Sequence, residues 1–204
     1  MIAYEQFSQC LARHFSPVSS LTDNQIAALY RHCQLLELWN KKLNLTAIAD
    51  AEDAVLRHYC ESLFLGALLP PEAVSVADIG SGAGFPGIPM AVLRPDCQFT
   101  LIESHQRKAV FLREATRNCP RVQVLGERAE DVKLRFDWAV CRAVKWGQVV
   151  GTMARVACHA GFLIGQNDAV ELVKTAGIDW HKPIRMPWGE RRVVLIGSRV
   201  SRET

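Results

Sequence analysis

The residues of this chain that could do chemistry gather in one short stretch, VADIGSGAGFPGIPMA at positions 76–91. Four glycines fall within eight positions of it, namely Gly80, Gly82, Gly84 and Gly87. Glycines this close together let a backbone approach a ligand closely. Residues 82–87 satisfy the dinucleotide-binding pattern G-x-G-x-x-G, and Glu103 falls about 20 residues further on, where a ribose-binding carboxylate belongs. Because the same letters also fit a loop for a sulfonium cofactor, two ligand classes are open.

Three details of the sequence favour the sulfonium cofactor, S-adenosylmethionine. Asp78 lies just before the loop, where a carboxylate repels a pyrophosphate but attracts ammonium and sulfonium groups. Pro86 and Pro89 occupy the first turn of the following predicted helix, and since proline has no N–H they weaken the donor array that grips phosphate. The first glycine after the predicted strand is Gly80, so the dinucleotide pattern fits only when it is shifted along the loop by two residues. We therefore predict that Asp78, Gly80 and Gly82 belong to a site for S-adenosylmethionine.

The elements that must position this loop begin with a strand, predicted from the short apolar, β-branched run at residues 74–79. In an open α/β sheet, ligands bind at the carboxyl ends of the strands, where the first strand turns into the first helix. Glu103 follows the second predicted strand, residues 99–102, so its carboxylate can accept hydrogen bonds from both hydroxyls of a ribose. The alternative for Glu103 is a solvated surface residue.

Strands and helices alternate after the loop. Further strands are predicted over residues 122–125, 136–141 and 162–164. Helices are predicted after Pro86, over residues 106–118 and within residues 147–158. This alternation predicts an α/β fold, with a Rossmann-like, mostly parallel sheet covered on both faces. Residues 184–187 and 191–197 are expected to form a C-terminal antiparallel hairpin at the edge of the sheet.

The first 70 residues read as successive helices. Thr22 and Gln25 form a capping box before an amphipathic stripe that reaches Trp39. Asp50 caps the next predicted helix, which Pro70 and Pro71 must end. We therefore predict an N-terminal helical region over residues 1–72 and a cofactor-binding domain over residues 73–204.

The composition is that of a globular protein, with 49% apolar and 22% charged residues in a chain of 204. A net charge of +3 permits a polyanionic partner without requiring one. The seven cysteines are scattered and no pair has C-x-x-C spacing, so we expect buried thiols in a reducing compartment and no metal site. The sequence shows neither a signal segment at its start nor a run of 18 apolar residues, which predicts a cytoplasmic protein with no membrane contact.

Six segments together carry a resemblance to a known family. They are WNKKLNLTAI (39–48), RHYCESL (57–63), DIGSGAGFPGIPMA (78–91), ESHQRKAVFLREA (103–115), RAED (128–131) and CRAV (141–144). They resemble the bacterial ribosomal RNA small-subunit methyltransferase G family, also called glucose-inhibited division protein B. The resemblance implies a class I S-adenosylmethionine-dependent methyltransferase that methylates N7 of a guanine in 16S ribosomal RNA and releases S-adenosylhomocysteine. The partner it implies is 16S ribosomal RNA or the small ribosomal subunit.

The resemblance also implies roles for particular residues. Gly80 and Phe85 match the loop contacts to the cofactor, and Ala129 with Glu130 matches the pair beside the adenine. Arg142, in CRAV, matches the arginine that closes the site; it could also contact the guanine O6 or the RNA backbone, or be a structural ion pair. Two departures from the family pattern stand out. Glu61 takes a position that is often aspartate. After the fifth predicted strand the family usually has a lysine-glycine pair, whereas this chain reads IGQND (164–168), so the rim formed by Gln166, Asn167 and Asp168 departs from the family pattern.

The implied reaction needs little acid–base chemistry. Guanine N7 carries a free lone pair in its neutral form, so methylation requires no general base. Catalysis then rests on presenting the base in line with the S–CH₃ bond, and we predict no catalytic triad and name no catalytic residue. We interpret His58, in RHYCESL, as a packing residue rather than a base.

A run of basic residues is consistent with an RNA substrate. It comprises Arg107, Lys108, Arg113, Arg117, Arg121 and Arg128. Other functions remain open on the sequence: a methyltransferase of another RNA, of a small molecule or of a protein, an NAD-dependent oxidoreductase, and an RNA-binding protein with an inactive site.

Overall fold

The computed structural model describes residues 2–48 and 50–200. Helices come first along the chain: α1 (Tyr4–Phe15), α2 (Asp23–Leu43), α3 (Ala51–Ala54), the π-helix η1 (Val55–Cys60) and α4 (Glu61–Ala67). The predicted capping box is present, because the Thr22 side chain accepts from the Gln25 N–H while the Gln25 side chain accepts from the Thr22 N–H. Asp50 caps α3 by accepting from the Asp53 N–H. The all-helical character predicted for the first 70 residues is confirmed.

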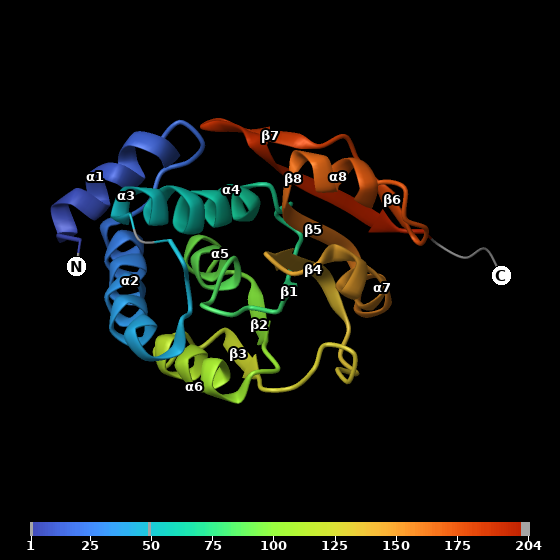
Figure 1. The fold of residues 1–204 in the computed structure, drawn as a ribbon, viewed down its shortest axis with the longest axis horizontal. Helices are drawn as coiled ribbons and strands as arrows, with labels where there is room; N and C mark the ends of the chain where they lie inside the picture. The colour runs from blue at the N-terminus through green and yellow to red at the C-terminus, as the bar shows by residue number, and fades with distance from the viewer. Residues whose placement is uncertain (1, 49, 201–204) are drawn as a thin grey trace.

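Strands and helices then alternate as the sequence predicts. The strands are β1 (Ser75–Ile79), β2 (Gln98–Ile102), β3 (Val122–Leu125), β4 (Phe136–Arg142), β5 (Ala157–Gly165), β6 (Ile178–Trp180), β7 (Ile184–Met186) and β8 (Gly189–Arg199). The helices between them are α5 (Gly87–Leu93), α6 (Gln106–Ala115), α7 (Trp146–Val156) and α8 (Gln166–Leu172). The order in the sheet is β3-β2-β1-β4-β5-β8-β6, with β7 also paired to β8 (Figure 1).

The sheet is parallel through its first five strands and antiparallel at its C-terminal edge. β7 and β8 form the predicted hairpin. The strand order reverses at β1, which lies between β2 and β4, and this reversal is where open α/β sheets bind ligands. The predicted α/β fold class is therefore confirmed.

Successive side chains of the central strands point to opposite faces of the sheet, and each face packs against helices. Ala77 and Ile79 of β1 pack with α7 and α8, where Met153 contributes to the same core. Val76, on the other face of β1, packs with α4 and α5 through a core that includes Met90. Helices thus cover both faces of the sheet.

The N-terminal helices share a third core with the sheet domain. Phe7, Leu29 and Tyr59 pack in one cluster with Phe85 and Phe111. In Figure 1, α2 lies beside α5 and α6. The boundary between residues 1–72 and 73–204 stays a prediction. Successive helices give way to alternating strands and helices at this boundary, and the third core contains residues from both sides of it.

Some elements differ from the sequence-based expectation. β5 begins at Ala157, although only residues 162–164 were expected to be a strand. Its first half holds Ala160 and Gly161, which have weak strand preference, and a side chain at Gly161 would lie 3.2 Å from Leu65. Helix α8 and strand β6 were not predicted. Among the described helices, none is both long and apolar enough to cross a membrane.

Candidate functional site

The glycine loop leaves β1 in backbone conformations that require glycine. Gly80, Gly82 and Gly84 have φ values of 72°, 56° and 89°. A Cβ added to Gly80 would lie 2.7 Å from the Cγ2 of Val144. The N–H groups of Gly80 and Ser81 both donate to the Ile102 carbonyl, at 2.9 and 3.1 Å, which fixes the loop to the end of β2. The loop is therefore both tightly turned and closely packed.

Asp78 lies beneath this loop and not in front of it. Its side chain is fully buried, and its Oδ2 accepts from the Gly87 N–H at 3.0 Å. Its Oδ1 is also buried and has no hydrogen-bond partner in the described structure. Burial raises the pKa of Asp78 from 3.8 to about 7. Because Asp78 does not line the cavity described next, the direct attraction of a cation expected from the sequence is corrected to support of the loop from below.

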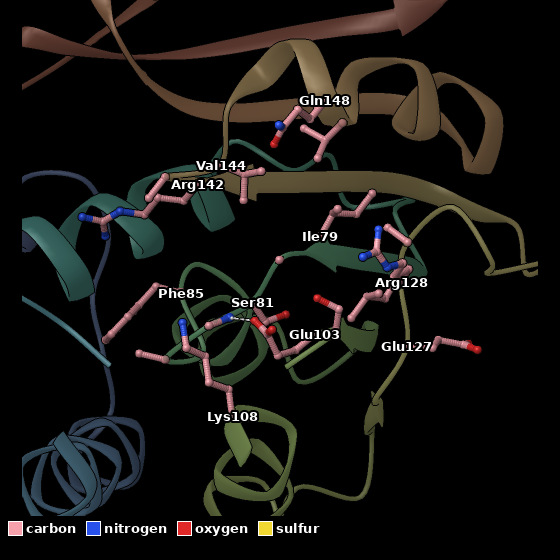
Figure 2. Close-up of a pocket in the computed structure, with 18 of the residues that line it drawn as sticks. Ile79, Ser81, Phe85, Glu103, Lys108, Glu127, Arg128, Arg142, Val144 and Gln148 are labelled. Carbon is pink, nitrogen blue, oxygen red and sulfur yellow. Dashed lines mark hydrogen bonds between the residues drawn. The ribbon is translucent and has the colours of Figure 1, made fainter. Parts of the chain in front are cut away.

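A cavity of about 500 Å³ opens at the carboxyl ends of β1, β2 and β4. Seven of the eight residues predicted for the cofactor site line it: Gly80, Gly82, Phe85, Glu103, Ala129, Glu130 and Arg142. Figure 2 shows Phe85 and Arg142 toward one end of this cavity, with Glu127 and Arg128 toward the other. The structure thus brings together residues from separate segments of the chain.

Glu103 ties the loops after β1 and β2 to each other. Its Oε2 accepts from the Gly82 N–H at 2.9 Å and its Oε1 from the His105 N–H at 2.7 Å. Each carboxylate oxygen can accept more than one hydrogen bond, so sites remain for ligand hydroxyls. The surface alternative for Glu103 is wrong, because this residue is only 8% exposed.

Ala129 and Glu130 are held in place by a residue that the sequence did not single out. Arg155, near the end of α7, donates to the carbonyls of Ala129 at 3.1 Å, Glu130 at 3.0 Å and Val132 at 2.9 Å. An arginine in the last turn of a predicted helix gives no sign that it binds a loop about 25 residues earlier in the chain.

One wall of the cavity comes from the N-terminal region. His58 lines the cavity and stacks on Phe85, with ring centroids 4.5 Å apart. Its Nε2 lies 2.7 Å from the Thr46 Oγ1, and the backbone of Thr46 is itself hydrogen-bonded at both N and O by the Asn40 side chain. Burial, followed by the charge of Arg142, lowers the pKa of His58 from 6.5 to about 3. A neutral, stacked imidazole agrees with its interpretation as a packing residue.

His32 is a second link from the N-terminal region, and the sequence did not reveal it. Its Nδ1 lies 2.9 Å from the Tyr59 hydroxyl and its Nε2 lies 3.0 Å from the Ala83 carbonyl. Burial lowers the pKa of His32 to about 4, so the ring is neutral. The carbonyl can only accept, so Nε2 carries the proton and Nδ1 accepts from Tyr59.

Arg142 belongs to a buried ion cluster and also lines the cavity. Its Nη2 lies 3.6 Å from the Glu61 Oε2, and Arg192 Nε donates to the same oxygen at 2.9 Å. Arg142 also donates to the Arg57 carbonyl. Burial lowers the pKa of Arg142 to about 10, with Glu61 opposing the shift, so the guanidinium stays charged at neutral pH. The ion-pair alternative for Arg142 is confirmed, and a ligand contact remains compatible with it.

The basic run lies mostly on the surface around α6. Lys108 and Arg128 line the cavity, whereas Arg113 in α6 and Arg117, just beyond its end, are exposed. The helix expected over residues 106–118 ends at Ala115. Arg117 pairs with Glu114, which offsets part of the local positive charge. The described residues contain no cluster of three or more side chains suited to a metal ion.

Comparison with known proteins adds independent information. Residues 25–173 match the family described as rRNA small subunit methyltransferase G, and the chain belongs to that family. The chain is 37% identical over 179 residues to the Ribosomal RNA small subunit methyltransferase G of Xanthomonas campestris pv. campestris, covering 84% of this chain and 79% of that protein. The protein of the same description from Dichelobacter nodosus is 48% identical over 107 residues, 52% of this chain. That match spans about half of the relative's length, 50%.

Solved structures with a similar fold are methyltransferases. A SAM-dependent methyltransferase from Aquifex aeolicus is 14% identical, with a TM-score of 0.61 over 83% of this chain and 98% of that chain. Magnesium protoporphyrin IX methyltransferase from Synechocystis, solved with bound SAM, is 13% identical, with a TM-score of 0.60 over 89% of this chain and 99% of that one. At these identities the likeness shows the fold, which is that of class I methyltransferases.

Proposed function

We propose, from its membership of the rRNA small subunit methyltransferase G family, that this chain transfers a methyl group from S-adenosylmethionine to N7 of a guanine in 16S ribosomal RNA. The observation that carries the proposal is the convergence of seven residues, chosen from the sequence, on one cavity at the strand-order reversal of the sheet. The family match covers residues 25–173 and so includes all of them.

The cavity fits S-adenosylmethionine. Its volume of about 500 Å³ is in the range of small-molecule sites, on the order of 300–1,000 Å³. Gly80 and Gly82 let the backbone approach the ligand, and the free lone pairs of Glu103 suit ribose hydroxyls. Ile102 and Val149 line the cavity with apolar surface suited to a flat adenine ring. When bound, S-adenosylmethionine supplies an electrophilic methyl group and leaves as S-adenosylhomocysteine.

The same loop is poorly suited to a dinucleotide. Helix α5 begins after Pro86, which has no N–H, and the Gly87 N–H already donates to Asp78. The helix N-terminus therefore has few donors free for a pyrophosphate. This arrangement argues against the NAD-dependent oxidoreductase.

The protein's own residues position the reactants. Guanine N7 needs no proton removed before it is methylated, so the requirement on the protein is orientation and exclusion of water. Phe85 and His58 close one wall with stacked rings. Arg142, held by Glu61, keeps a positive charge at the cavity and can hydrogen-bond an acceptor on the base or the RNA backbone.

RNA would approach over the mouth of this cavity. Lys108 and Arg128 lie at the cavity, and Arg107, Arg113 and Arg121 extend the positive charge along the surface. Phosphate contacts of this kind make binding weaken with salt. The location of such a reaction would be the cytoplasm, where ribosomes are assembled.

The decisive experiment maps 7-methylguanosine in 16S ribosomal RNA from cells with and without the gene for this chain. We expect one site to lose its methyl group in the deletion strain and to regain it when purified protein and S-adenosylmethionine are added to the isolated small subunits. Unchanged 7-methylguanosine in the deletion strain would overturn the RNA substrate. Calorimetry should show micromolar binding of S-adenosylhomocysteine and no response to NADH; the opposite pattern would overturn the cofactor.

A further inference from the structure

A second cavity, of about 440 Å³, lies directly beside the first. The two share Arg142, Ala143 and Val144, which lie at and just after the end of β4. The lining of the second cavity also includes the end of β5, residues 162–165, and Asp168 of α8. Because a single short segment separates the two cavities, a molecule in the second would lie next to one in the first.

The dividing segment has an unusual backbone. Ala143 has φ of 57°, in the left-handed region that residues with a side chain seldom adopt. Such outliers persist only where the surrounding structure enforces them, and they concentrate at functional sites. Val144 in turn packs over Gly80 of the cofactor loop. The segment between the cavities therefore has a constrained backbone and packs closely on the glycine loop.

The described residues that line the second cavity carry charges of both signs, with Lys145 among the basic ones. Arg142 and Arg192, both held by Glu61, supply hydrogen-bond donors. Asp168 is the single acidic side chain among the described residues that line this cavity. It is exposed, and within the described structure no hydrogen bond or ion pair engages its carboxylate. Trp146, half-buried in the same lining, offers an aromatic ring.

This set of groups matches guanine. The Watson–Crick edge of guanine carries the acceptor O6 beside two kinds of donor, N1–H and the N2 amino group. A carboxylate can accept from both donors at once, while a guanidinium donates to O6. Adenine has an acceptor at N1 and no 2-amino group, so the same carboxylate would repel its lone pair. Enzymes that modify a base read the extruded base by its Watson–Crick edge and by stacking.

We propose that the second cavity receives the target guanine, extruded from the RNA, and that Asp168 selects guanine by accepting hydrogen bonds from N1–H and the 2-amino group. This assignment rests on the proposed function. It leaves N7, on the adjacent Hoogsteen edge of the base, free to face the first cavity. Asp168 is a specificity-determining residue in this scheme and takes no part in moving a proton.

The test compares guanosine with inosine, which lacks only the 2-amino group, at the mapped target of a semi-synthetic 16S RNA. In single-turnover methylation, the wild-type chain should favour guanosine over inosine by at least about tenfold, the usual effect of a hydrogen bond to a charged group. Asp168→Ala should slow methylation of guanosine by at least this factor and bring the guanosine-to-inosine ratio close to one. Asp168→Asn, which keeps one acceptor, should lie between.

Two controls separate the outcomes. Glu171→Ala removes a nearby acid of α8 that does not line the cavity and pairs with Lys174, and it should leave the rate and the ratio unchanged. Binding of S-adenosylhomocysteine should be the same in Asp168→Ala and wild type, because Asp168 does not line the first cavity. If Asp168→Ala keeps the wild-type rate and ratio, or if the wild-type ratio is one, the assignment of Asp168 is overturned while the methyltransferase stands. If the wild type methylates no RNA at all, the proposed function and this assignment both fall.

Discussion

Glu61→Gln is the substitution that most directly tests how the site is held together. The Glu61 side chain is 3% exposed and its Oε2 lies 2.9 Å from Arg192 Nε and 3.6 Å from Arg142 Nη2. Glutamine has almost the same shape as glutamate. The substitution therefore removes a negative charge while leaving the packing intact, and Arg142 remains buried without its counter-charge.

The expected loss of stability follows from the burial of the three side chains. Removing one partner of a buried ion pair typically costs about 3–5 kcal/mol. Arg142 is only 8% exposed, whereas Arg192 is 33% exposed and is more easily hydrated. We therefore expect the lower end of the range, a loss of about 3 kcal/mol in the free energy of unfolding. For a chain of this length the melting temperature should fall by roughly 6–12 °C.

Urea unfolding followed by tryptophan fluorescence at pH 7.5 measures this loss, with thermal melting alongside. Glu171→Gln is the matched control, because it breaks an exposed pair with Lys174 and should cost less than about 0.5 kcal/mol. Adding Arg142→Met to Glu61→Gln should recover part of the stability, since it removes the unpaired buried charge. A loss for Glu61→Gln as small as that of the control would refute the reasoning, and so would a double variant less stable than the single one.

Two further predictions concern the loop and the buried titratable groups. Gly80→Ala should weaken S-adenosylhomocysteine binding by at least about tenfold in calorimetry, because the left-handed backbone resists a side chain and Val144 blocks the new Cβ. Gly151→Ala, in an open position of α7, should instead raise stability by about 0.5–1 kcal/mol and leave binding unchanged; equal behaviour of the two variants would contradict the prediction. The pKa values of His32 and His58 are lowered in the folded protein, so the unfolded chain binds protons more readily at these residues. The stability that the two histidines contribute is therefore complete above pH 6.5 and is lost as the pH falls toward 4 for His32 and 3 for His58. Asp78, with its pKa raised to about 7, acts in the opposite direction and contributes stability that is lost as pH rises from 3.8 through 7. Between pH 6.5 and pH 5 the stability lost through the two histidines exceeds the stability gained through the one carboxyl, so we expect a lower urea midpoint at pH 5. An equal midpoint at both pH values would show that the two rings are protonated in the folded protein.

The sequence predicts the order of elements well because hydrophobic periodicity is local. A strand followed by a glycine loop and a helix is a contiguous pattern, so the sequence alone is enough to locate this loop at the end of β1. The same locality explains where prediction failed for Asp78. The proximity of Asp78 to the loop in sequence suggested contact with a ligand, but strand alternation turns its side chain to the same face as Val76, toward α5.

Contacts between distant segments could not be read from the sequence at all. Glu61 and Arg192 are separated by 131 positions, and His32 reaches Ala83 across 51. No local pattern encodes such pairs, since each depends on how whole helices pack against the sheet. Arg155 is a similar case, because its three acceptors are backbone carbonyls, which every residue carries.

Three contacts tie the N-terminal region to the lining of the first cavity. His32 bonds the carbonyl of Ala83, His58 stacks on Phe85, and Glu61 pairs with Arg142. Each of these contacts ends on a residue that lines the first cavity. The segments WNKKLNLTAI and RHYCESL, which carry the family resemblance outside the loop, contain Asn40, Thr46 and His58, the hydrogen-bonded series that forms this wall. We therefore expect a change at Asn40 or Thr46 to shift the His58 ring that stacks on Phe85.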